Sequence, residues 1–107
     1  MEQGKDEMQG FERVCALENV PEHMPLRVEY GGRGVLICRD GEDVYAVDEI
    51  CPHENESMRR AVVFNKEIIC PHHQYRFKLE TGRCNRRCAP LQVYRVKIDG
   101  GEVWVST

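Results

Sequence analysis

The sequence predicts an all-β protein, an antiparallel β-sandwich or barrel base with one small subdomain inserted into it. Short apolar or alternating stretches follow one another at close spacing, and glycine-rich turns separate them, which is typical of this class. The sequence contains no long apolar stripe of helical period. The length of 107 residues is that of one domain, so residues 1–107 are expected to form a single domain.

The first two predicted strands precede the first glycine-rich turn. Residues 1–9 are polar and are expected to be flexible, and residues 11–17 form the first strand. A short helix is possible around residues 18–22, interrupted by Pro21. Residues 26–30 alternate between apolar and polar, which indicates a strand with one face in water.

A predicted hairpin follows these strands. Residues 31–34 read GGRG and form a turn, after which the apolar run at residues 35–38 predicts a buried strand. An Asp-Gly pair within residues 39–43 then turns the chain into a strand at residues 44–47. The strands at residues 35–38 and 44–47 are therefore predicted to pair antiparallel.

The C-terminal end predicts a second hairpin. Residues 93–98 alternate, residues 99–101 turn the chain, and residues 102–105 return. Predicted strands therefore bracket the middle of the chain on both sides. The segment of about residues 50–80 is interpreted as an inserted subdomain and not as a linker.

The inserted segment repeats the tripeptide Cys-Pro-His. Residues 51–53 read CPH and residues 70–73 read CPHH, which corresponds to Cys-x-His, sixteen residues, then Cys-x-x-His. Each proline fixes φ just after a cysteine, so each loop can present its ligand in one pose. The candidate metal ligands are Cys51, His53, Cys70 and His73.

Two kinds of centre suit these ligands. Two thiolates and two imidazoles fit tetrahedral zinc, and they also fit a [2Fe–2S] cluster in which two histidines replace two cysteines on one iron. Ligand type does not separate these two kinds of centre. The spacing differs from that of the usual zinc finger, because each loop here mixes one cysteine with one histidine.

The motif resembles that of the Rieske iron–sulfur family, and the likeness extends over roughly residues 10–106. Outside the ligands it is carried by Met58, Val63, Arg76, Phe77, Thr81, Gly82, Pro90, Leu91, Tyr94, Val96, Asp99 and Gly100. The resemblance implies a [2Fe–2S] cluster, with Cys51 and Cys70 on the inner iron and His53 and His73 on the more exposed outer iron. It makes about residues 50–80 the cluster-binding subdomain. His72 is one residue too early for the motif and is expected to pack over the loop.

This chain departs from the family at three glycine positions, which here hold Asn55, Ala61 and Gln74. Glycine serves left-handed backbone or close approach, and asparagine tolerates left-handed backbone. Ala61 and Gln74 therefore fit the family's backbone less well than Asn55 does.

Other departures concern the reduction potential. High-potential relatives carry hydroxyl side chains at the positions of Tyr75 and Phe77, and a disulfide at the positions of Glu56 and His72. Phe77 cannot donate a hydrogen bond, and the disulfide cannot form. We therefore predict a potential at the low end of the family's range, about −150 mV.

The resemblance implies a soluble Rieske-type ferredoxin, a one-electron carrier from a flavin-dependent NAD(P)H reductase to a terminal oxygenase. The chain lacks room for a mononuclear iron domain, so it is expected to serve an enzyme system without being an enzyme. Partners would dock near His53 and His73, with Arg59, Arg60 and Arg76 as candidate contacts. Two alternatives remain: a small Rieske-like subunit of a nitrite-reductase-type enzyme, and a zinc-stabilised interaction module.

The charge distribution allows two interpretations: scattered solvated charge, or a basic face beside the cysteines that meets an acidic protein partner. Residues 51–90 carry eight basic and four acidic side chains, whereas the whole chain has a net charge of −3. The acidic total and the scarcity of aromatic residues argue against nucleic acid. No apolar run reaches the roughly 20 residues that span a bilayer, and the N-terminus has no secretory pattern, so we expect a cytoplasmic protein without membrane partners.

In a reducing compartment the six cysteines are expected to be thiols or ligands. Cys15 and Cys38 lie in apolar strands and are interpreted as small buried hydrophobic residues. Cys84 and Cys88, in an arginine-rich stretch, are interpreted as plain loop thiols.

Overall fold

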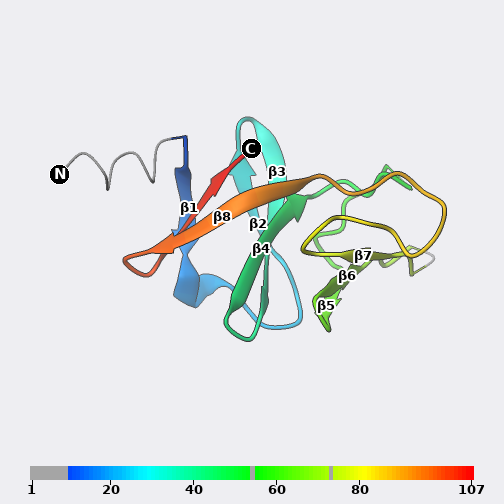
Figure 1. Ribbon diagram of the computed structural model, residues 1–107, viewed down its shortest axis with the longest axis horizontal. Helices are drawn as coiled ribbons and strands as arrows, with labels where there is room; N and C mark the ends of the chain where they lie inside the picture. The colour runs from blue at the N-terminus through cyan, green and yellow to red at the C-terminus, as the bar shows by residue number, and fades with distance from the viewer. Residues whose placement is uncertain (1–9, 54, 73) are drawn as a thin grey trace.

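The structure, a computed structural model, describes residues 10–53, 55–72 and 74–107. These ranges form one six-stranded sheet and one three-stranded sheet, both antiparallel (Figure 1). The strands are β1 (Glu12–Ala16), β2 (Leu26–Tyr30), β3 (Arg33–Asp40), β4 (Asp43–Asp48), β5 (Val62–Phe64), β6 (Glu67–Ile69), β7 (Arg76–Lys78), β8 (Val93–Asp99) and β9 (Glu102–Ser106). A short 3-10 helix, η1 (Leu17–Asn19), follows β1.

The larger sheet has the strand order β1-β9-β8-β4-β3-β2. Its two edge strands, β1 and β2, contact each other, so the sheet curls into a nearly closed barrel (Figure 1). This arrangement confirms the predicted all-β class with an antiparallel base.

Strand β3 separates two hydrophobic cores, because successive side chains of a strand point to opposite faces. Val35 and Ile37 face the barrel core, which Val103 and Val105 of β9 also line. Leu36 faces the second core. All four residues of the predicted run at 35–38 are fully buried, which confirms a strand covered on both faces.

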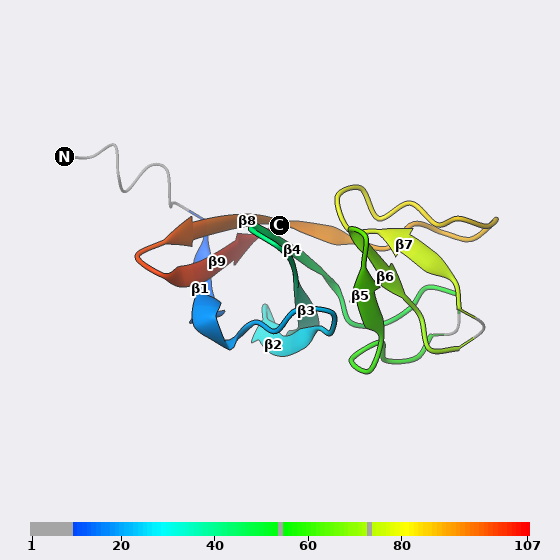
Figure 2. The ribbon, with the colours of Figure 1, turned by 90° about the horizontal axis from the view of Figure 1, so that it is seen from below.

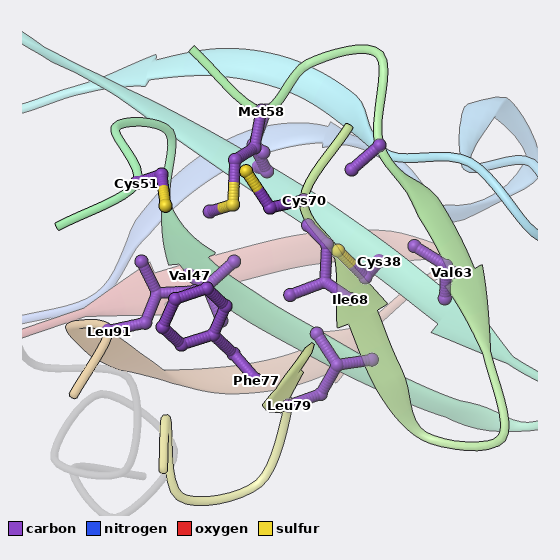
Figure 3. Packing of buried hydrophobic residues seen from close by; sticks show 12 residues of the cluster. Cys38, Val47, Cys51, Met58, Val63, Ile68, Cys70, Phe77, Leu79 and Leu91 are labelled. Carbon is purple, nitrogen blue, oxygen red and sulfur yellow. The ribbon is translucent and has the colours of Figure 1, made fainter. Parts of the chain in front are cut away.

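The second sheet has the order β5-β6-β7 and lies beyond β3 at one end of the molecule (Figure 2). Met58, Ile68 and Phe77 fill the core between this sheet and the outer face of β3 and β4. Figure 3 shows this second core, which also contains Cys51 and Cys70.

The structure corrects three details of the predicted elements. The turn predicted at residues 31–34 is only two residues long, since Gly31 and Gly32 have φ of 60° and 78° and β3 begins at Arg33. The helix considered around residues 18–22 is instead the single turn of η1. Strands β5, β6 and β7 were not predicted, because three residues are too few to show a period. The N-terminal stretch of residues 1–9 lies outside the described residues.

Candidate metal centre

Two loops hold the cysteines of the repeated motif. Ligand loop 1, residues 51–57, follows β4, and ligand loop 2, residues 70–75, joins β6 to β7. Both Cys51 and Cys70 are 0% exposed and belong to the second core (Figure 3). The structure therefore brings together two cysteines that are far apart in the sequence.

The two ligand loops share one backbone pattern. The Cys51 N–H donates to the Glu56 carbonyl at 2.8 Å, and the Cys70 N–H donates to the Tyr75 carbonyl at 2.8 Å. Four residues after each cysteine the backbone is left-handed, with φ of 59° at Asn55 and 55° at Gln74. The doubled tripeptide thus corresponds to a doubled loop.

His53 is half-buried, and its Nδ1 atom is buried. Its ring stacks on the Tyr75 ring of the other loop, with centroids 3.6 Å apart and planes 16° from parallel. The Arg86 guanidinium lies 4.7 Å from the Tyr75 centroid. Aromatic stacks of this kind contribute about 0.5–1.5 kcal/mol beyond their buried area, so the stack joins the two loops.

The fourth predicted ligand, His73, lies outside the described residues. His72 Nε2 lies 3.1 Å from Glu56 Oε1, and this contact joins the two ligand loops. Within the described ranges no three His, Cys, Asp or Glu side chains converge as a single-metal site requires. A binuclear cluster divides its ligands between two irons, so it does not require one point of convergence.

A buried carboxylate anchors ligand loop 1. Glu49 is 8% exposed, and it accepts hydrogen bonds from Arg27 Nε at 2.8 Å and Ser57 Oγ at 2.6 Å. Burial by itself raises the pKa of Glu49, but the hydrogen bonds from Ser57 and Arg27 outweigh it and the pKa is lowered. The Met58 N–H also donates to the Glu49 carbonyl at 2.8 Å, so the loop is held at its base.

Of the other four cysteines, two are free and buried and two form a disulfide. Cys15 and Cys38 are buried, as predicted, and burial raises the pKa of Cys38 to about 12. The prediction of plain thiols is wrong for Cys84 and Cys88, which form a disulfide. The chain turns back between them and brings their Cα atoms to 6.2 Å, within disulfide range.

The donor set fits a [2Fe–2S] cluster with mixed ligands. Cys51 and Cys70 offer two thiolates in a core that excludes water, and His53 offers an imidazole at the edge of that core. Sequence reasoning missed Glu49 and Arg86. Neither residue lies within the Cys-Pro-His motif, and their contacts depend on segments distant in sequence.

The family and the curated relatives agree with this chemistry. A family model described as the Rieske-like [2Fe–2S] domain matches residues 10–106. The chain is 35% identical over 97 residues to the ferredoxin component of a naphthalene 1,2-dioxygenase system from Pseudomonas aeruginosa, covering 87% of this chain and 91% of that protein.

Solved structures share the fold. The ferredoxin of carbazole 1,9a-dioxygenase from Nocardioides aromaticivorans IC177 is 32% identical, with a TM-score of 0.82 over 90% of this chain and 96% of that one. A ferredoxin solved in complex with the reduced oxygenase of carbazole 1,9a-dioxygenase is 29% identical. Its TM-score is 0.81, and the match covers 92% of this chain and 94% of that one. A protein described as the small subunit of an NADPH nitrite reductase is 25% identical, with a TM-score of 0.81 over 91% of this chain and 98% of that one. Together with the paired loops and buried cysteines, these matches show that the chain belongs to the Rieske-like [2Fe–2S] domain family.

Proposed function

We propose that this chain is a one-electron carrier between a flavin-dependent NAD(P)H reductase and a terminal oxygenase. The observation that carries the proposal is the pair of matching loops that bring Cys51 and Cys70 into one buried core. When bound, the [2Fe–2S] cluster takes up and releases one electron. The dioxygenase ferredoxins among the relatives support this role over that of a catalytic subunit.

Four residues of the chain are the proposed ligands of the cluster, two for each iron. Cys51 and Cys70 are the proposed ligands of the inner iron, where the core keeps water away. His53 and His73 are the proposed ligands of the outer iron, and the half-buried position of His53 supports an exit for electrons there. Residues of about 50–80 then form the cluster-binding subdomain of a single domain.

A hollow beside ligand loop 2 offers a docking surface for an acidic partner. Its volume is about 280 Å³, and Cys70, Arg60 and Arg76 are among the residues that line it. Val62, which also lines it, is 50% exposed, so the hollow presents both basic and apolar groups. Basic groups beside apolar ones favour an acidic, partly apolar protein surface.

We infer a cytoplasmic carrier with a low reduction potential. Phe77 is fully buried and has no hydrogen-bond donor for the cluster, which supports the value of about −150 mV. In the part of the chain that the structure describes, no helix is long and apolar enough to cross a membrane.

The first test is spectroscopic. Anaerobically purified protein should be brown, contain two irons and two acid-labile sulfides, and give a rhombic EPR signal of low average g after reduction. Replacement of His53 or His73 by Ala should remove that signal. A colourless protein with one zinc and no sulfide would establish the zinc-stabilised interaction module instead.

The second test concerns docking. Arg59 and Arg60 reversed together to Glu should slow reduction by an NADH-driven ferredoxin reductase several-fold and weaken its salt dependence, because encounter of opposite charges is steered. The control reverses Arg95, an exposed residue of β8 outside the inserted subdomain. Unchanged rate and salt dependence would show that these arginines do not dock the partner.

A second candidate function is the small subunit of a nitrite-reductase-type enzyme. The shared fold with such a subunit, at 25% identity, favours it. Co-purification with a large catalytic subunit would establish this candidate, whereas free exchange between a reductase and an oxygenase would support the carrier.

A further inference from the structure

The side chains of His53, Tyr75 and Arg86 form a stack that joins the two ligand loops to the loop at residues 84–88. The Tyr75 ring lies flat against the His53 imidazole, and the Arg86 guanidinium lies over the Tyr75 ring. One aromatic ring therefore connects a fixed positive charge to a proposed ligand of the outer iron. Such cation–π contacts are favourable over an aromatic ring such as that of tyrosine.

A closed loop holds Arg86 in this position. The disulfide between Cys84 and Cys88 closes residues 84–88, and both cysteines pack against the second core together with Tyr75. Inside the loop, the Arg86 N–H donates to Cys84 Sγ at 3.4 Å and the Cys88 N–H donates to the Arg86 carbonyl at 3.0 Å. These contacts restrict where the guanidinium can lie.

Arg86 is exposed, and among residues 10–53, 55–72 and 74–107 no carboxylate forms an ion pair with it. Two carboxylates of the inserted subdomain have other partners, since Glu56 contacts His72 and Glu67 contacts Arg76. Uptake of an electron adds negative charge to the cluster, and a neighbouring cation favours that state.

We propose that Tyr75 and Arg86 are positioning residues for His53, that the loop between Cys84 and Cys88 keeps them in place when its disulfide is formed, and that the guanidinium charge raises the midpoint potential of the cluster. The inference rests on the proposed function, because it requires a cluster bound through His53. It adds a tuning element outside the Cys-Pro-His motif.

The test measures the midpoint potential of the cluster-loaded full chain by redox titration monitored by EPR. Arg86→Gln removes the charge and should lower the potential, whereas Arg86→Lys keeps the charge and should stay near the parent value. The difference between Arg86→Gln and the parent should shrink as salt rises, because exposed charges are screened. Arg95→Gln is the matched control, since Arg95 lies 5.3 Å from the Phe11 ring in a similar contact on β8.

A second set of variants tests the stack itself. Tyr75→Phe keeps the ring and should leave the potential near that of the parent. Tyr75→Leu and the double variant Cys84→Ser, Cys88→Ser release the guanidinium and should each shift the potential as Arg86→Gln does. Iron content and EPR line shape, measured on each sample, separate a shift in potential from loss of the cluster.

The outcomes separate this inference from the proposed function. A parent protein without iron, sulfide or the rhombic signal overturns both. A parent protein with the expected cluster, but with equal potentials in Arg86→Gln and Arg95→Gln, overturns only the inference. Equal shifts in Arg86→Gln and Arg86→Lys would also overturn it, because charge would then not be the cause.

Discussion

At the scale of single residues, the two ligand loops differ in how well their side chains suit the backbone. Asn55 and Gln74 both follow a loop cysteine by four positions and both have positive φ. Asparagine tolerates this conformation, whereas a longer side chain pays a steric penalty of roughly 1–2 kcal/mol. Ala61, the third departure from the family's glycines, is not among the residues with positive φ.

We expect Gln74→Gly to raise the free energy of unfolding by about 0.5–1 kcal/mol, because glycine removes the strain at φ of 55° but loses more chain entropy. Asn55→Gly is the matched control and should change stability less. Urea unfolding of the cluster-loaded protein, followed by circular dichroism, measures both. Equal gains at the two positions would contradict this explanation.

A second residue-scale feature is the contact between Glu56 and His72. These positions hold a disulfide in the high-potential proteins that the sequence resembles, and here a non-covalent contact of 3.1 Å replaces it. Both side chains are partly exposed, so the contact is worth about 0.2–1 kcal/mol. It joins the two ligand loops.

Glu56→Ala and His72→Ala should each speed the loss of the cluster to a chelator by up to about fivefold, and the double variant should be no worse than either single variant. The loss of visible absorbance measures the rate. Asp43→Asn breaks a similarly exposed ion pair with Lys66, remote from the ligand loops, and should leave the rate unchanged. Additive effects of the two alanines would show that the contact does not couple the loops.

At the scale of elements, β3 positions ligand loop 1 through a glycine. A Cβ at Gly34 would overlap Glu49 Oε1, the carboxylate that accepts from Arg27 and Ser57. Gly34 also accepts a hydrogen bond from the Glu49 N–H at 3.1 Å, so the backbones of the two segments are in contact. The strand and the loop base therefore fit only with glycine at this position.

Gly34→Ala should lower the free energy of unfolding by about 1–3 kcal/mol, because it displaces a buried carboxylate from its hydrogen bonds. The double variant Gly34→Ala, Glu49→Ala should be no less stable than Glu49→Ala alone, since the overlap is then gone. Chemical denaturation of the three variants measures the effect. If the losses of stability in the two single variants add in the double variant, the overlap with Glu49 is not the cause of the Gly34→Ala effect.

Elements differed in how far the sequence could predict them. The run at 35–38 was predicted correctly as buried because four consecutive apolar residues reflect burial on both faces. Strands β5, β6 and β7 are three residues each, and their pairing depends on contacts with one another. The disulfide between Cys84 and Cys88 was missed because loop closure is a property of the folded chain.

At the scale of the whole molecule, the protein has two cores that share β3 and β4. The barrel core contains Tyr94, whose hydroxyl donates to Asp48 Oδ1 at 2.7 Å near the end of β4. Burial, followed by the bond to Asp48, raises the pKa of Tyr94 to about 12. The unfolded phenol has a pKa of about 10, so the folded state retains this proton to higher pH.

This difference predicts alkaline destabilisation of the whole protein. The contribution of Tyr94 is fully present below about pH 10 and is lost as pH rises toward about 12. Tyr94→Phe has no such proton and should be less stable at pH 8 but lose less stability between pH 10 and 12. Urea unfolding across that range measures the slopes, and parallel slopes would exclude Tyr94 as the cause.

The sequence alone specifies the all-β class and the paired Cys/His motif. Both depend on patterns that are local, namely alternation, turn residues and ligand spacing. Tertiary structure decided which distant side chains meet, such as His53 with Tyr75, Tyr75 with Arg86, and Glu49 with Gly34. These contacts join side chains that lie apart in the sequence, and no short stretch of sequence contains that packing.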